Sequence, residues 1–306
     1  MKITRSRTLL GVVGALTLAV SLTACGSSSN SNSSSAGTTG GTSSPTASVS
    51  VDPSLAAAVP SAIKSSGTIS IGTDSTYAPS EFLAPDGKTI IGFDVDLFNA
   101  VAAKLGLKTQ WQSAKFDSII PGVTSGKYNI GVSSFTINPE REAQATMVSY
   151  FAAGTQWGQK AGGSVNPDAA CGKPVAVQTG TVQVADLMSR STKCTAAGNP
   201  AIKIDQYQAQ SDATAAVVSG KDAAMLADSP VVAYAVKQTN GQLTLLGTIY
   251  ASAPYGYVLP KDQTSFGTAI ASAVKQLITD GTYNKILTKW GVQAGAITNP
   301  TVNPKS

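Results

Sequence analysis

Two patterns of apolar and polar positions, one typical of strands and one typical of helices, alternate along the chain. Residues 68–74 alternate apolar and polar side chains, which predicts a strand, and turn residues follow at 78–80. Residues 92–105 instead place apolar side chains at intervals of three and four, which predicts a helix with one buried face. Gly106 follows this helix, where a left-handed C-cap would end it.

The succession of strand and helix continues to the C-terminus. The sequence predicts further strands at 107–111, 129–133, 174–178, 201–205, 223–226 and 255–259. It predicts further helices at 116–125, 181–190, 209–220, 229–238, 264–279 and 282–290, and one more that opens at Asn138 and Pro139. Because strands and helices succeed one another in short units, we expect an α/β fold with a mostly parallel sheet covered on both faces.

The first 24 residues have the pattern of an export signal rather than that of a fold element. Lys2, Arg5 and Arg7 precede an apolar run from Leu9 to about Leu22. A run of roughly 14 residues is shorter than the roughly 20 that a membrane helix needs, and an uncleaved anchor is the alternative. We therefore expect residues 1–24 to be a signal peptide.

The end of this run, Leu22-Thr-Ala-Cys25, resembles the lipobox of bacterial lipoproteins. The resemblance implies cleavage before Cys25 and a thioether-linked diacylglycerol on its sulfur, which would tether the protein outside the cell. Residues 25–51 are then a lipid-anchored linker, and their Ser, Gly, Thr and Asn composition predicts disorder. The remaining roughly 250 residues are enough for one large or two modest domains.

Charge and composition exclude several classes of function. Loss of the signal peptide would lower the formal net charge from +5 to +2, which leaves no basis for nucleic-acid binding. Histidine is absent, so Ser/His/Asp triads, Cys/His nucleophile pairs and the usual catalytic zinc centres are excluded. We expect neither a cofactor nor a metal. The two cysteines other than Cys25, Cys171 and Cys194, favour a disulfide in an exported chain, with two unpaired thiols as the alternative.

Seven stretches of the chain follow one another in the order typical of one protein family: 71–79 (IGTDSTYAP), 92–97 (GFDVDL), 116–121 (FDSIIP), 136–141 (TINPER), 175–181 (VAVQTGT), 227–230 (ADSP) and 280–290 (DGTYNKILTKW). Over about residues 66–291 the chain resembles the polar amino-acid substrate-binding proteins of ABC importers, solute-binding protein family 3. The resemblance implies the type II periplasmic-binding-protein-like fold, in which two crossover strands join two lobes around a ligand cleft. It places the discontinuous first lobe at 52–155 and 253–306 and the second at 156–252, with crossovers near 154–158 and 250–254.

The resemblance assigns the ligand's carboxylate to Arg141. A planar guanidinium suits this role because it donates two parallel hydrogen bonds. Thr136 would add a hydroxyl donor, and Thr181, at the start of a predicted helix, an amide and a hydroxyl. The alternative for Arg141 is an ion pair with Glu142 or another acid on an exposed helix.

The ligand's ammonium group is assigned by the same resemblance to Asp228, supplemented by the hydroxyl or carbonyl of Ser134. These two residues would lie on opposite lobes, so that a bound ligand bridges them and favours closure. Asp228 precedes Ser-Pro, and the alternative is that it serves only as the N-cap of the next helix.

Three further residues outline the pocket by resemblance. The rings of Tyr77 and Phe116 would sandwich the aliphatic part of the ligand, and Asp74 would lie at its side-chain end. The alternatives are two core aromatics and a structural turn acid. Asp94 and Asp96 look like a catalytic carboxylate pair, but their place in the first turn of a helix is explained by the helix dipole.

These observations predict a lipoprotein receptor that captures a polar amino acid and delivers it to an ABC permease with its cytoplasmic ATPase. The family precedent is monomeric, and the Cys171/Cys194 pair resembles a subset from high-GC Gram-positive bacteria. One alternative is an arogenate or prephenate dehydratase on the same scaffold, which would need an acid such as Asp74 with a strongly raised pKa. Another is an amino-acid sensory receptor.

Overall fold

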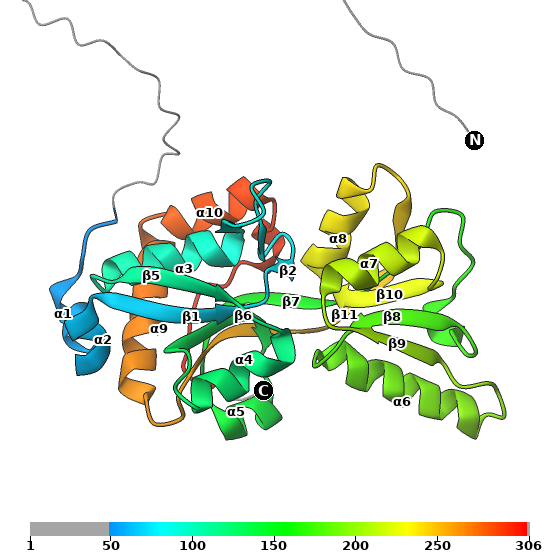
Figure 1. The fold of residues 1–306 in the computed structure, drawn as a ribbon, viewed down its shortest axis with the longest axis horizontal. Helices are drawn as coiled ribbons and strands as arrows, with labels where there is room; N and C mark the ends of the chain where they lie inside the picture. The colour runs from blue at the N-terminus through cyan, green and yellow to red at the C-terminus, as the bar shows by residue number, and fades with distance from the viewer. Residues whose placement is uncertain (1–48, 305–306) are drawn as a thin grey trace, which may run out of the picture. The chain divides into compact units, whose positions relative to one another are not determined.

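The computed structural model describes residues 49–304, which contain one continuous eight-stranded sheet in the order β5-β1-β6-β11-β7-β10-β8-β9 (Figure 1). The predicted signal peptide, the lipidated Cys25 and nearly all of the predicted linker lie outside the described residues. Helices pack on both faces of the sheet, and its two halves form two lobes (Figure 1). This is the mixed α/β two-lobe fold that the resemblance implied.

The first lobe is built on three parallel strands, because β1 pairs with both β5 and β6 in parallel register. Its strands are β1 (Thr68–Thr73), β5 (Lys108–Ser113) and β6 (Ile130–Thr136). Its helices are α1 (Pro53–Ala57), α2 (Ser61–Ser66), α3 (Phe93–Lys104), α4 (Phe116–Thr124), α5 (Pro139–Gln144), α9 (Thr264–Thr279) and α10 (Thr282–Trp290), followed by a 3-10 turn at Gln293–Gly295. A small separate sheet joins β2 (Thr76–Tyr77), β3 (Glu81–Leu83) and β4 (Ile90–Ile91).

The second lobe repeats the alternating plan on a smaller scale, with β8 parallel to both β9 and β10. Its strands are β8 (Pro174–Gln178), β9 (Lys203–Tyr207) and β10 (Ala224–Asp228). Its helices are α6 (Val182–Ala196), α7 (Gln210–Ser219) and α8 (Ser229–Gln238), preceded by a 3-10 turn at Pro167–Ala169.

Two long strands run through both lobes: β7 (Thr146–Lys160) and β11 (Leu243–Leu259) pair antiparallel along most of their length. The register between them shifts between Leu246 and Tyr250 and again before Ala253, where the strands cross from lobe to lobe. The predicted crossovers at 154–158 and 250–254 fall inside these strands. The lobe boundaries that we placed there stay a prediction.

The expectation of a mostly parallel sheet needs correction, because the sheet is mixed. Periodicity indicated only residues 255–259 of β11 and none of β7. The first half of β7 is buried on both faces, so it shows no alternation of apolar and polar residues, whereas much of β11 is exposed. Their pairing depends on contacts between residues far apart in the chain, which periodicity does not report.

Helix prediction was closest where spacing and turn chemistry agree. The helices α8, α9 and α10 have the predicted bounds, and α3 differs by one residue at each end. In the second lobe, α6 runs to Ala196, well past the predicted end at residue 190. None of the helices of residues 49–304 has the length and apolar character needed to span a membrane.

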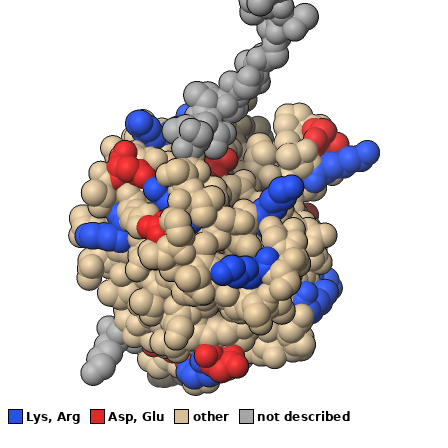
Figure 2. Space-filling model, turned by 90° about the vertical axis from the view of Figure 1, so that its left-hand side faces the viewer, with Lys and Arg blue, Asp and Glu red and all other residues tan. Residues whose placement is uncertain are grey.

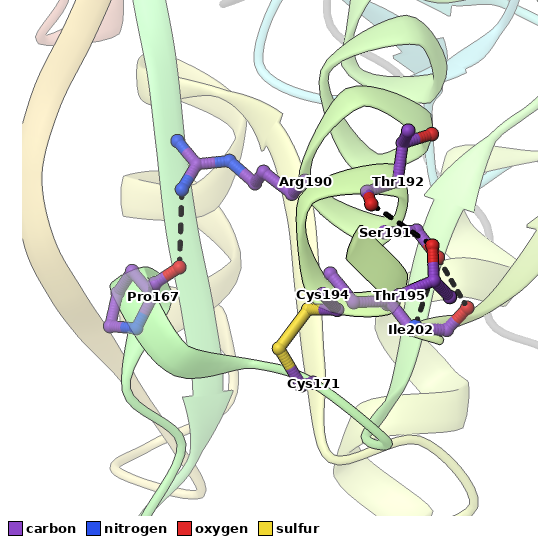
Figure 3. The surroundings of a disulfide bond; sticks show 8 residues. All are labelled: Pro167, Cys171, Arg190, Ser191, Thr192, Cys194, Thr195 and Ile202. Atoms are coloured by element: carbon purple, nitrogen blue, oxygen red, sulfur yellow. Dashed lines mark hydrogen bonds between the residues drawn. A yellow bond between two sulfur atoms is a disulfide. The ribbon is translucent and has the colours of Figure 1, made fainter. Parts of the chain in front are cut away.

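The disulfide predicted between the two cysteines other than Cys25 is confirmed. Cys171, in the loop before β8, is bonded to Cys194 in the last turn of α6, with a Cα–Cα distance of 5.6 Å (Figure 3). One helical turn earlier, Arg190 Nη1 donates a hydrogen bond of 3.1 Å to the Pro167 carbonyl (Figure 3). The two links fasten α6 to the segment between β7 and β8.

Charged side chains do not gather by sign on the face that Figure 2 presents. Lysine and arginine side chains are interspersed there with aspartate and glutamate over a largely uncharged surface (Figure 2).

Candidate functional site

The lobes meet at Asp228, which ends β10 in the second lobe. Its Oδ2 accepts a hydrogen bond of 2.8 Å from the Tyr77 hydroxyl of β2, and its Oδ1 accepts one of 2.7 Å from Gln183 Nε2 of α6. Burial raises the pKa of Asp228, while these hydrogen bonds and the positive charge of Arg141 oppose the rise. Although Asp228 is the N-cap of α8, its side chain makes no capping hydrogen bond, so the N-cap alternative does not account for the carboxylate.

Arg141 lies in the short helix α5, where its backbone N–H donates to the Asn138 side chain that caps the helix. Arg141 is only 8% exposed, and its guanidinium donates to two backbone carbonyls, that of Thr136 at 2.8 Å and that of Gly180 at 3.1 Å. Among residues 49–304 no carboxylate lies within salt-bridge distance of it, so the predicted alternative of an exposed ion pair with Glu142 is not found. Burial lowers the pKa of Arg141 to about 10.

Two aromatic rings flank this guanidinium. Phe116, the first residue of α4, stacks on Phe135 of β6 with ring centroids 4.6 Å apart and planes 20° apart. Arg141 Cζ lies 5.4 Å from each ring centroid, within the range of a cation–π interaction. The sequence assigned no role to Phe135, although a large apolar residue between the serines and threonine of this loop is the signal for it.

Asp74 follows β1 and is 2% exposed. Its Oδ1 accepts from the backbone and the hydroxyl of Thr76, as a turn acid would. Its Oδ2 accepts from the Phe116 N–H at 3.1 Å and from Gln178 Nε2 of the second lobe at 2.8 Å. Burial raises the pKa of Asp74 and these four donors oppose it. Asp74 therefore makes both the local turn contacts and a contact between lobes.

Glutamine side chains of the second lobe are a part of the site that sequence reasoning missed. Gln178 ends β8 and Gln183 lies in the first turn of α6, and both reach aspartates at the junction of the lobes. The carboxyl ends of parallel strands meet at one edge of a sheet, and ligands of open α/β sheets bind outside that edge. The place of Gln178 at the end of a predicted strand was the available signal.

The three hydroxyl residues among the predicted site residues make different kinds of contact. Ser134 has a left-handed backbone, with φ of 50°, and both its N–H and its hydroxyl donate to Asp94 Oδ2. Thr136 contributes its carbonyl to Arg141, and Thr181 donates its hydroxyl to the Gln178 carbonyl just before α6. Asp94 lies in the first turn of α3 as predicted, but its carboxylate is buried and hydrogen-bonded, so the helix dipole alone does not explain it.

A cavity of about 320 Å³ opens beside Arg141 and is lined by α4, α5 and the start of α6. Its lining includes Phe116, Phe135, Arg141, Gly180 and Thr181. A larger cavity of about 470 Å³, between α8 and α10, contains none of the predicted site residues. No cluster of three or more potential metal ligands occurs in the described part of the chain.

Comparison with known proteins gives a family and several relatives. Residues 69–293 match the model of the bacterial extracellular solute-binding proteins, family 3. The arginine-binding protein ArgT of Corynebacterium glutamicum is 35% identical over 81% of this chain and 82% of its own. The lysine/arginine/ornithine-binding periplasmic protein of Escherichia coli is 28% identical over 77% of this chain and 92% of its own.

Solved structures agree with this assignment. An ancestral arginine-binding protein bound to glutamine superposes with a TM-score of 0.68 at 31% identity, over 74% of this chain and 98% of its own. The ancestral amino acid-binding protein AncCDT-1, described as a precursor of cyclohexadienyl dehydratase, superposes with a TM-score of 0.67 at 30% identity, over 75% and 97%. The chain belongs to the bacterial extracellular solute-binding proteins of family 3, the amino-acid-binding proteins of ABC transporters.

Proposed function

We propose that this protein captures a polar amino acid by lobe closure and delivers it to an ABC permease, with arginine as the first candidate ligand. One observation carries the proposal. The Arg141 cation of the first lobe and the Asp228 anion of the second are both buried at the junction of the lobes, yet they form no direct ion pair. A free amino acid carries the complementary charges on adjacent groups.

The proposed roles follow from charge and position. Arg141 would bind the ligand carboxylate with the Thr136 and Thr181 hydroxyls, and Asp228 would bind the ammonium with help from Ser134. Burying either ligand charge without a partner would cost several kcal/mol, so both protein charges are needed. Because they come from different lobes, a ligand that contacts both stabilises the closed arrangement over an open one.

The ligand side chain would extend toward Asp74, between the rings of Tyr77 and Phe116. The Gln178 amide at Asp74 Oδ2 is a donor that a ligand amide or guanidinium can replace without loss of hydrogen bonding. Names of relatives support a cationic ligand, since the C. glutamicum relative is called an arginine-binding protein. Arginine presents five donors in a planar fork and so suits a buried carboxylate.

Two finer parts of the proposal concern location and assembly. The resemblance of residues 22–25 to a lipobox supports a lipid anchor at Cys25, on the outer face of the cytoplasmic membrane. We propose a monomer that docks on the permease in its closed form. A sensory receptor would use the same pocket, and neighbouring permease and ATPase genes would favour transport.

A dehydratase is the second candidate, favoured by burial, which raises the pKa of Asp74, and by the relationship to AncCDT-1. Four hydrogen-bond donors oppose protonation of that carboxyl, which favours the receptor.

The proposed function is tested by calorimetry on the chain lacking residues 1–25, refolded from denaturant to remove carried-over ligand. Arginine, lysine, glutamine, glutamate and prephenate are the probes. Stoichiometric binding of arginine supports the proposal, whereas turnover of prephenate, or silence with every amino acid, overturns it.

A further inference from the structure

Two buried acids behind the proposed ligand site lie near each other without a cation partner among residues 49–304. Glu81 of β3 and Asp94 of α3 are both 0% exposed, and the charge of Asp94 adds to burial in raising the pKa of Glu81. The ion pairs of residues 49–304 all involve other acids. Two ionised carboxylates in such a place would repel each other at short range, in addition to their desolvation cost.

The backbone forces this juxtaposition. Gly92 has φ of 146°, and a Cβ at this position would lie 2.0 Å from the Ser80 carbonyl oxygen, so only glycine permits the start of α3 to approach β3 so closely. The N–H of Asp94 donates to that same carbonyl at 3.1 Å. Asp94 is thereby held beside Glu81, the residue that follows Ser80.

Each carboxyl group has one oxygen that accepts hydrogen bonds and one that has no donor among residues 49–304. Glu81 Oε1 accepts from the Ser133 hydroxyl at 2.9 Å, and Asp94 Oδ2 accepts from Ser134 and from the Tyr150 hydroxyl at 2.6 Å. Glu81 Oε2 and Asp94 Oδ1 are buried and find no donor among residues 49–304. One proton between these two oxygens would satisfy both of them and remove one of the two charges.

We propose that Glu81 and Asp94 share one proton in the folded protein and act as a positioning pair for Ser133 and Ser134. The proton belongs mainly to Glu81, whose Oε2–H donates to Asp94 Oδ1. Asp94 accepts three other hydrogen bonds, which favour its ionised form, whereas Glu81 accepts one from Ser133. This part of the inference holds whether or not the protein binds an amino acid.

The positioning role rests on the proposed function. The Ser133 hydroxyl donates to Glu81 and accepts from the N–H of Asp74, and Asp94 holds Ser134 in its left-handed backbone conformation. Asp74 and Ser134 are two of the residues proposed to bind the ligand. Ionisation of the second carboxyl would place two like charges behind this segment and release it.

The other ionisable groups around the pair are acids and tyrosines. Tyr150 of β7 donates to Asp94, and Tyr257 of β11 stacks on Tyr150 with centroids 4.0 Å apart. The charges of Asp74, Tyr77 and Tyr283 interact with the pair from the turn after β1, from β2 and from α10. Burial is the main cause that raises the pKa of Glu81 well above its usual value, and the neighbouring charge of Asp94 raises it further. Burial also raises the pKa of Asp94, to about 6.

The sign of the pH dependence follows from a raised pKa. The folded protein keeps a proton that the unfolded chain has released, so this contribution to stability is complete below pH about 4.5 and is lost as pH rises through the pKa of the pair. In that window the folding equilibrium constant should fall by up to about tenfold per pH unit. Buried Asp74 and Asp228 act in the same direction, so the comparison must be between variants.

Thermal and chemical unfolding from pH 4 to pH 9 tests the pair with Glu81→Gln. The glutamine amide can donate to Asp94 Oδ1 permanently while its carbonyl accepts from Ser133, so we expect wild-type stability in acid and a flatter decline toward pH 9. Asp96→Asn is the matched control, because Asp96 lies on the same helix but pairs with Lys289 at the surface, and it should keep the wild-type decline above pH 6. An equal slope in wild type and Glu81→Gln would overturn the proposal.

A second measurement does not depend on how well a variant folds. Infrared spectra of the wild-type protein at pH 7 should contain the carbonyl band of a buried protonated carboxyl, and Glu81→Gln should lack the part of that band that comes from Glu81. Absence of that band in wild type would overturn proton sharing.

The positioning role is tested by arginine binding at pH 6 and pH 9. Wild type and Asp96→Asn should lose the same amount of affinity between these pH values, and Glu81→Gln should lose less. Equal losses in all three would remove the positioning role alone, and a failure to bind arginine would concern the proposed function only.

Discussion

Tyr77 and Asp228, which lie 151 residues apart in the sequence, are joined by a hydrogen bond of 2.8 Å from the tyrosine hydroxyl to the carboxylate. Tyr77 comes from the small sheet beside the first lobe, and Asp228 ends a strand of the second, so this bond links the lobes. The ammonium of the proposed ligand would need the same carboxylate. Under the proposed function, closure and ligand binding would therefore both depend on one buried acid.

Replacement of Asp228 should have opposite effects on ligand affinity and on stability at higher pH. Asp228→Asn keeps the shape and one acceptor oxygen for Gln183, and its amide N–H can donate to the Tyr77 hydroxyl, but it removes the charge that pairs with an ammonium. We expect affinity for the amino acid to fall at least about 100-fold, or roughly 2.8 kcal/mol. Since burial raises the pKa of Asp228, the variant should also lose less stability than wild type as pH rises from about 4.

Calorimetry and thermal unfolding at several pH values measure the two effects. Asp212→Asn is the control, because Asp212 is an exposed acid in the first turn of α7 in the same lobe. Wild-type affinity in Asp228→Asn would rule out the ammonium contact.

The guanidinium shape of Arg141 should matter as well as its charge. Arg141→Lys keeps a cation but loses the planar fork that now donates to the carbonyls of Thr136 and Gly180. We expect affinity to fall about tenfold or more, because an ammonium cannot bind a carboxylate through two parallel hydrogen bonds. Titration calorimetry checks this, with Arg190→Lys, remote from the site, as the matched substitution. Similar losses in both variants would contradict the assignment.

An aromatic contact outside the pocket should contribute to closure. Phe82 of β3 lies 5.8 Å, between ring centroids, from Tyr234 of α8 in the second lobe and 5.8 Å from Trp290 of α10. Phe82→Ala removes both pairs and should destabilise the closed arrangement by about 1 kcal/mol. Affinity should then fall about fivefold without any change at the ligand.

Calorimetry and small-angle X-ray scattering of the ligand-saturated and ligand-stripped protein test this contact. Leu83→Ala, at an exposed neighbouring position, is the control. Unchanged affinity in Phe82→Ala would show that closure does not use the aromatic contact.

Loss of the disulfide should affect stability but not binding. Cys171 and Cys194 are 23 residues apart in sequence, and Cys194 lies in the last turn of α6, at the other end of the helix from Thr181. Replacement of both by serine should lower the free energy of unfolding by about 3 kcal/mol, mainly by freeing the unfolded chain. Denaturant unfolding with and without reductant measures this. A change in ligand affinity of more than a few-fold would mean that the link also positions α6.

The sequence identified where the proposed site residues lie in the fold, but it did not predict their contacts. Asp74, Tyr77, Phe116, Arg141 and Asp228 do lie together where the lobes meet. Their present partners were not foreseen: Tyr77 contacts Asp228, Phe116 stacks on Phe135, and Asp74 accepts from Gln178. Motif order identifies a residue's place in a fold, whereas its partner depends on which distant segment lies opposite.

The sequence by itself determined the local elements of this protein. Spacing of three and four, a proline at the start of α8 and glycines around α10 are properties of neighbouring residues, and these helices have the bounds that they predicted. The presence of two cysteines besides Cys25 likewise indicated the disulfide. Only the tertiary structure decided the antiparallel pairing of β7 and β11, the link between the lobes at Asp228 and the contact of Glu81 with Asp94. Each of these joins residues distant in the chain, and burial then changes the protonation of the acids that it brings together.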